Sequence, residues 1–120
     1  MSEELVNIAS EYRDKIPELE GLLIGKLDGT QIWADTLTDL NHEFILSSAS
    51  VVARAMKKLS QSIEKGEIKQ IDCEVEKGFL TIVLSNKAMV IGFFGEDTRS
   101  QLAIIQKNLR MLMRKIDDII

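Results

Sequence analysis

The sequence predicts an α/β fold of the α+β kind, in which helices cover both faces of a five-stranded antiparallel sheet. The hydrophobic periodicity changes in the order helix, two strands, long helix, three strands, helix. Asp28-Gly29 separates the first two strands, which is the strongest short-range signal for a hairpin. With 120 residues and no linker-like stretch, the chain is expected to form a single domain over residues 1–120.

Composition and charge exclude several classes of function. The chain is 45% hydrophobic and 28% charged, as in folded proteins, and its net charge of −4 argues against binding to nucleic acid. No apolar run approaches the roughly 20 residues of a membrane span. A single cysteine is typical of a reducing compartment, and the acidic start of the chain is the opposite of the basic start of a signal peptide. We therefore expect a cytoplasmic protein without direct membrane insertion, cofactor or metal.

The first helix is predicted over residues 2–16, with Ser2 as its N-cap and Pro17 as its stop. The first two strands are predicted over 21–27 and 30–36. In the second of these, Trp33 alternates with its apolar neighbours, and we expect it to pack under a terminal helix.

The middle helix is predicted over residues 42–65, with Asn41 as N-cap and Gly66 at the C′ position. Its apolar arc covers roughly 200°, more than one face of a sheet needs, so a second surface should cover this helix. The predicted core stripe comprises Ile45, Ala49, Val52, Met56, Leu59 and Ile63, flanked by Phe44, Val51 and Ala55 on one side and by Leu46 and Ala53 on the other.

Three strands follow over residues 68–76, 79–85 and 88–95. The second and third are apolar throughout, as expected where both faces are buried. The first alternates, so it should lie at an edge with Ile71, Cys73 and Val75 toward the core. The last helix is predicted over 99–119, with Thr98-x-x-Gln101 as a capping box.

A catalytic function finds little support in the sequence. His42 is the only histidine, and no nucleophile or carboxylate accompanies it in a recognisable motif. Cys73 is expected to be a small buried hydrophobe without a base to ionise it. We therefore expect no enzymatic activity, and a small-molecule sensor or minor hydrolase near His42 is the weakest of the hypotheses.

Two surface features point to protein partners instead. The unpaired edge strand and the excess apolar arc of the middle helix could both be covered by one two-fold contact, the commonest geometry of oligomers. A polar edge that is only protected from pairing is the alternative. The outer face of the middle helix carries charge of one sign, which suits an acidic partner; a plain solvated face is the alternative there.

Three short segments carry a resemblance to a known family. They are Glu20-Gly21-Leu22-Leu23-Ile24, Leu27-Asp28-Gly29 and Leu102-Ala103-Ile104-Ile105. With the element order, they make the chain resemble the Roadblock (dynein light chain 7-like) family in its prokaryotic or archaeal form, whose fold is related to longin and profilin. The resemblance implies a symmetric homodimer. Its interface would comprise Ile68, Gln70, Ile71, Asp72, Cys73, Glu74, Val75, Phe44, Val51 and Ala55.

The resemblance also implies a function. Members of the family are non-enzymatic platforms for small Ras-like GTPases, which implies that this chain biases the nucleotide state of such a GTPase. The contact would comprise Ser47, Ser50, Arg54, Lys57, Lys58 and Gln61. The alternative is a longin- or profilin-like adaptor that assembles a multiprotein complex without sensing nucleotide.

Overall fold

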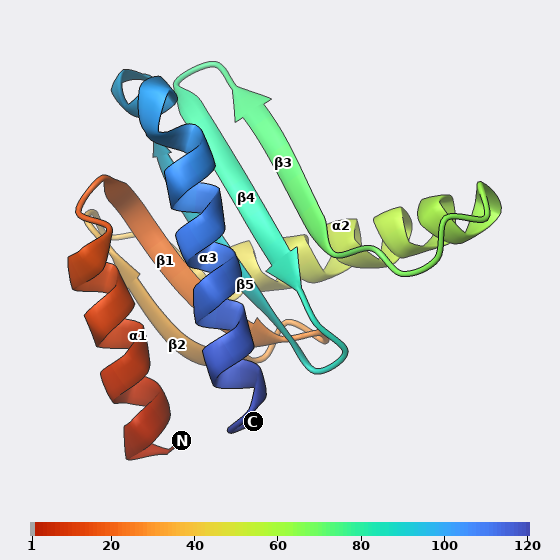
Figure 1. The fold of residues 1–120 in the computed structure, drawn as a ribbon, viewed down its shortest axis with the longest axis horizontal. Coiled ribbons are helices and arrows are strands. Elements are labelled where there is room, and N and C mark those ends of the chain that lie inside the picture. The colour runs from red at the N-terminus through yellow and green to blue at the C-terminus, as the bar shows by residue number, and fades with distance from the viewer. Residues whose placement is uncertain (1) are drawn as a thin grey trace.

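The computed structural model describes residues 2–120 and contains the predicted elements in the predicted order (Figure 1). They are α1 (Glu3–Lys15), β1 (Leu19–Lys26), β2 (Gln31–Thr36), α2 (His42–Ser62), β3 (Gln70–Val75), β4 (Gly78–Leu84), β5 (Ala88–Gly95), a 3₁₀ helix η1 (Glu96–Gln101) and α3 (Leu102–Asp117). The strands form one antiparallel sheet in the order β2-β1-β5-β4-β3. The fold class is therefore confirmed, and β3 lies at an edge as expected.

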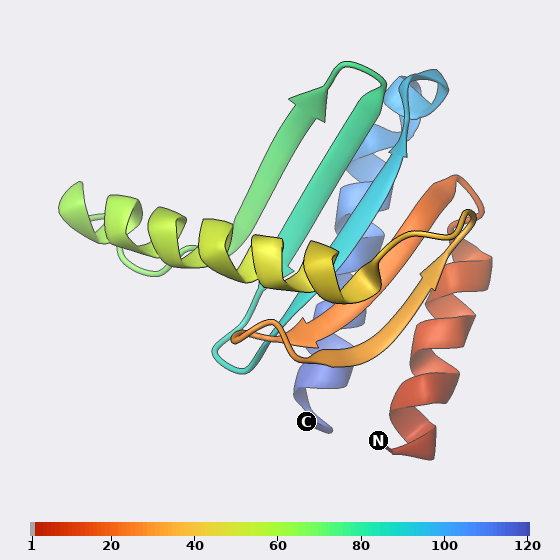
Figure 2. The ribbon, with the colours of Figure 1, turned by 180° about the vertical axis from the view of Figure 1, so that it is seen from behind.

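Helices α1 and α3 lie side by side on one face of the sheet, and α2 crosses the other face (Figures 1 and 2). The larger core lies on the α1/α3 face, where Tyr12 and Leu109 are fully buried. A β-carbon at Gly92 of β5 would lie 2.8 Å from the Leu109 side chain, so this glycine lets α3 approach the sheet closely. Trp33 packs against the same core, which confirms its predicted place.

The core on the α2 face is smaller. It comprises Leu23, Leu46, Ala49, Ile71, Ile82, Met89 and Ile91. Figure 2 shows that α2 crosses only part of the sheet and leaves the ends of β3, β4 and β5 nearest the β3–β4 turn uncovered. The C-terminal half of α2 extends beyond the β3 edge, so no strand lies under it.

Local chemistry explains where the first helices and the hairpin begin and end. The Ser2 hydroxyl accepts a hydrogen bond from the Leu5 amide (3.1 Å), and Asn41 Oδ1 accepts one from the Phe44 amide (3.0 Å), so both predicted N-caps are confirmed. In the β1–β2 turn, Gly29 adopts a φ of 93°, a conformation that favours glycine. The Thr30 amide donates to Asp28 Oδ1 (2.9 Å), which fixes the turn.

Several predicted termini were wrong. The capping box does not form: η1 precedes α3, and the Thr98 hydroxyl donates to the Gly95 carbonyl instead (2.7 Å). Helix α2 ends at Ser62, three residues before the prediction, and both Glu64 (φ 59°) and Gly66 (φ 84°) adopt left-handed conformations after it. Strand β1 begins at Leu19, two residues before the prediction, and β3 at Gln70, two residues after it.

Candidate functional site

Helix α2 presents three different flanks along its length. The sheet-facing flank is buried and comprises Leu46, Ala49, Ser50 and Ala53. At about 100° per residue, the exposed residues then divide into two groups on either side of this flank. The apolar flank comprises Phe44, Val51, Val52, Ala55, Leu59 and Ile63. The polar flank comprises Ser47, Arg54, Lys57, Lys58 and Gln61.

The predicted core stripe of this helix was wrong at three of its positions. Val52, Leu59 and Ile63 are 42%, 53% and 58% exposed. The periodicity placed them correctly on one side of the helix, but the helix crosses the sheet obliquely and continues past its edge. Side chains expected in the core therefore extend the exposed apolar flank.

The free edge of β3 presents unpaired backbone groups. The Leu84 amide donates to the Lys69 carbonyl (2.9 Å), so residue 69 directs its backbone toward β4. Backbone direction alternates along an antiparallel strand. Gln70, Asp72 and Glu74 consequently direct their amides and carbonyls to the open side, where no strand within residues 2–120 pairs with them.

The burial of the β3 side chains also differs from the sequence prediction. Cys73 and Val75, expected toward the core, are exposed, while Ile71 alone of the three is buried. The physical reason is that α2 does not cover the end of β3 nearest the β3–β4 turn (Figure 2). The side chain of Ile71, which the resemblance assigns to the dimer contact, packs in the core of the α2 face.

The polar side chains of β3 bind to the elements on the opposite face. Gln106 Nε2 and the Thr81 hydroxyl both donate to Asp72 Oδ1 (2.9 and 2.8 Å). Arg99 forms an ion pair with Glu74 (2.9 Å), and Arg110 donates to the Gln70 side-chain oxygen (3.0 Å). These contacts hold the edge strand against η1 and α3, so the strand is ordered although its edge is open.

An uncovered apolar surface joins α2 to the sheet, and we call it the apolar shelf. It consists of the apolar flank of α2 together with Cys73, Val75, Leu80 and Phe93 on the adjoining sheet face. Leu80 and Phe93 are half-buried. Sequence analysis found Phe44, Val51 and Ala55 but missed Leu80 and Phe93, because fully apolar strands read as buried on both faces. The excess apolar arc of α2 was the signal that an uncovered surface exists.

Ser50 does not belong to the polar flank, which corrects another predicted site residue. It is 2% exposed, and its hydroxyl donates to the Leu27 carbonyl (2.6 Å). This hydrogen bond ties α2 to the β1–β2 turn. The other five residues predicted with Ser50 are exposed on the polar flank.

The imidazole of His42 lies beside the hydroxyl of Thr36. Thr36 Oγ1 lies 2.8 Å from His42 Nε2 and 2.7 Å from the Thr38 carbonyl. Because the single hydroxyl proton is donated to that carbonyl, the imidazole donates to Thr36 and does not act as its base. Within residues 2–120 no group of histidine, cysteine and carboxylate side chains could hold a metal ion. No helix in the same range is long and apolar enough to cross a membrane.

One carboxyl group near α2 has a shifted pKa. Hydrogen bonds from the backbone and side chain of Thr30 lower the pKa of Asp28 below its ordinary value. The cause is the geometry of the β1–β2 turn, because the charged carboxylate accepts the Thr30 amide hydrogen. The shift therefore reflects turn formation and does not indicate a catalytic acid.

Comparison with known proteins identifies the fold. No protein-family model and no curated protein matches the chain. Among solved structures, MglB from Myxococcus xanthus superposes with a TM-score of 0.87 at 13% identity, over 98% of this chain and 94% of that one. A Roadblock/LC7 domain from Streptomyces avermitilis gives 0.80 at 14% identity over 92% of both chains. The gliding protein MglB from Thermus thermophilus gives 0.78 at 13%, over 92% of this chain and 83% of that one. The chain therefore has a Roadblock-type fold.

Proposed function

We propose that this protein is a cytoplasmic, non-catalytic dimeric scaffold that binds a small Ras-like GTPase and biases its nucleotide state. The observation that carries the proposal is the position of the apolar shelf beside the open β3 edge. Exposed apolar patches bounded by polar residues mark association sites, and an open edge favours pairing with another strand. The Roadblock-type fold and the resemblance described above support the same function.

The dimer we propose uses both features at once. The β3 edges of two copies pair antiparallel around a two-fold axis, through the backbone groups of Gln70, Asp72 and Glu74. The sheet becomes continuous, and α2 of the second copy fills the apolar shelf of the first. Phe44, Val51 and Ala55 then become buried, together with the side chains of Cys73 and Val75 and the half-buried Ile68.

The GTPase would bind on the polar flank of α2, which the proposed dimer leaves exposed. Between Ser47 and Gln61 the helix carries Arg54, Lys57 and Lys58 and no acidic residue, although the chain as a whole has a net charge of −4. A local positive surface on an acidic protein suits an acidic partner and speeds the encounter with it. A scaffold can shift the nucleotide state of its partner only by its difference in affinity for the two states.

Two measurements test this function in sequence. Light scattering on a sizing column should give about 27 kDa, twice the 13.5 kDa of the chain. Biolayer interferometry with small Ras-like GTPases, each loaded with GDP or a non-hydrolysable GTP analogue, should then show tighter binding of one form. Equal affinity for both forms would favour the adaptor that does not sense nucleotide.

The contact surface is tested by a charge change on the polar flank. Lys58→Glu with Gln61→Glu should weaken GTPase binding about tenfold or more without changing the mass of the dimer. Lys107→Glu with Gln101→Glu makes the same charge change at exposed positions on α3 and η1 and is the matched control. Normal binding by the α2 variant would place the GTPase elsewhere.

A further inference from the structure

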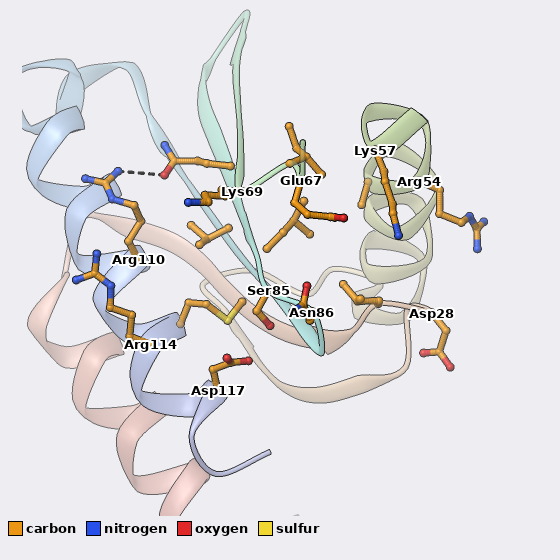
Figure 3. A pocket seen from close by; sticks show the side chains of 17 residues that line it. Asp28, Arg54, Lys57, Glu67, Lys69, Ser85, Asn86, Arg110, Arg114 and Asp117 are labelled. Carbon is orange, nitrogen blue, oxygen red and sulfur yellow. Dashed lines mark hydrogen bonds between the residues drawn. The ribbon is translucent and has the colours of Figure 1, made fainter. Parts of the chain in front are cut away.

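A cleft of about 860 Å³ lies at the end of the sheet where β3 begins and β4 ends. Its walls come from α2, from the segment that leads into β3, from the β4–β5 turn and from the last turns of α3 (Figure 3). This volume falls in the range of small-molecule sites, roughly 300–1,000 Å³. The cleft is separate from the apolar shelf, and of the polar flank of α2 it includes only Arg54 and Lys57.

The lining of the cleft carries more positive than negative charge. Its five cationic side chains face three carboxylates, although the chain has a net charge of −4. The cations are Arg54, Lys57, Lys69, Arg110 and Arg114. None of them forms an ion pair within residues 2–120, where the two ion pairs are Arg13–Asp35 and Arg99–Glu74. Such a cleft raises the local concentration of anions.

Two arginines and a lysine are placed to hold one anionic group. Arg110 and Arg114 are four residues apart on α3, so they lie on the same side of that helix. In Figure 3, Lys69 points toward Arg110, whose one hydrogen bond goes to the neutral Gln70 side chain (3.0 Å). A guanidinium group can donate two parallel hydrogen bonds to two oxygens of one phosphate. An anion bound between side chains of like positive charge also reduces the repulsion between them.

The remaining lining suits an organic body rather than a bare ion. Val83 and Met113 form a buried apolar floor with half-buried Ile68. Asp117, also in the lining, has a buried Oδ1 that accepts no hydrogen bond from residues 2–120. As part of the lining, the Asp117 carboxylate can accept a hydrogen bond from a ligand hydroxyl or amine.

We propose that this cleft binds a soluble phosphomonoester with hydroxyl groups, such as a nucleoside monophosphate. The phosphate lies between Arg110, Arg114 and Lys69. The apolar side of the ligand rests on Val83 and Met113, and a hydroxyl donates to the Asp117 carboxylate. The cleft borders both surfaces proposed above, because it shares Arg54 and Lys57 with the GTPase contact and Ile68 and Gln70 with the dimer contact.

Isothermal titration of the full chain with AMP, adenosine and inorganic phosphate tests the site. AMP should bind once per chain and more weakly as salt is raised, because the contact is with charged groups. Adenosine should not bind measurably, and inorganic phosphate should bind more weakly than AMP. Equal titrations with AMP and adenosine, no binding of AMP, or binding only to phosphatidic acid vesicles would each overturn the proposal.

Substitutions of the lining residues test which of them contact the ligand. Arg110→Gln with Arg114→Gln should lower AMP affinity about tenfold or more, and Arg114→Gln alone, which leaves the Gln70 contact intact, should lower it severalfold. Lys65→Gln with Lys107→Gln removes the same charge at exposed positions outside the cleft and should have little effect. Asp117→Ala should weaken AMP but not inorganic phosphate. An equal loss in the control pair would show non-specific attraction and overturn the proposal.

Discussion

The two faces of the sheet differ in how completely helices cover them. On the α1/α3 face two helices lie side by side, and the core residues include a tyrosine and several leucines with no exposed area. On the α2 face a single oblique helix covers part of the strands, and five large apolar residues of that helix and its C-cap are exposed: Phe44, Val51, Val52, Leu59 and Ile63. The same strands thus have one complete face and one incomplete face.

This difference separates the source of stability from the surface for association. A face that is closed within one chain contributes its hydrophobic free energy to folding. A face left open contributes its hydrophobic free energy to association, when a second molecule covers it. Because strands β4 and β5 are apolar on both sides, the incomplete face cannot be read as a solvated antiparallel sheet surface. Mutations on the closed face should consequently change the free energy of unfolding, and mutations on the open face should change the mass of the protein in solution.

The largest expected effect is on the closed face. Leu109→Ala should lower the free energy of unfolding by about 2–5 kcal/mol, because it leaves a cavity between α3 and the sheet. Leu59→Ala makes the same chemical change at a position that is 53% exposed, and should cost less than about 1 kcal/mol at concentrations where the protein is monomeric. Urea unfolding followed by circular dichroism measures both, and equal losses would contradict the distinction between the faces.

The second largest expected effect is on the open face, where a mutation should change the mass of the protein in solution rather than its folding. Val51→Asp with Leu59→Asp should convert the proposed dimer to a monomer of 13.5 kDa with its circular dichroism unchanged, because charges in the apolar shelf would be buried without partners. Asn7→Asp with Gln31→Asp adds the same two negative charges at exposed positions outside the shelf and should leave the mass unchanged. A persistent dimer of the shelf variant would place the contact elsewhere.

The element order, the sheet class, the edge position of β3 and two N-caps could be predicted because each depends on local chemistry. Periodicity identifies an amphipathic segment, and a side-chain oxygen before it caps it. Helix ends were less predictable: α2 ends at Ser62 with Glu64 as well as Gly66 in a left-handed conformation, and η1 replaces the capping box. The ends of helices depend on the conformation of the segment that connects one element to the next.

The candidate surfaces were harder to predict because burial depends on the crossing of α2 over the sheet. Periodicity shows which residues share a side of a helix but not where the helix extends past its support, so Leu59 and Ile63 were assigned to the core. The same cause inverted the burial of Cys73. Ser50 was misplaced because its partner, the Leu27 carbonyl, is distant in sequence. The cleft joins residues from five segments and has no local signature.

The smallest expected effect lies at the β1–β2 turn, where Asp28 borders the incomplete face. Because Thr30 hydrogen bonds lower the pKa of Asp28 in the folded protein, the contribution of this group to stability is present above its unfolded pKa. That contribution is lost as the pH falls through the lower folded pKa. Carboxyl chemical shifts measured against pH should therefore give a midpoint for Asp28 below the ordinary aspartate value.

Thr30→Val separates the two causes of this shift. The backbone hydrogen bond, which is the larger cause, remains, whereas the hydroxyl is removed from a side chain of nearly the same shape. The midpoint of Asp28 should rise but stay below the ordinary value. Lys26→Gln is the control for charge, since Lys26 lowers the pKa less than either Thr30 group does. A wild-type midpoint at the ordinary value would mean that the turn does not hold the Thr30 amide against Asp28, and that the β1–β2 connection under α2 is looser than its hydrogen bonds imply.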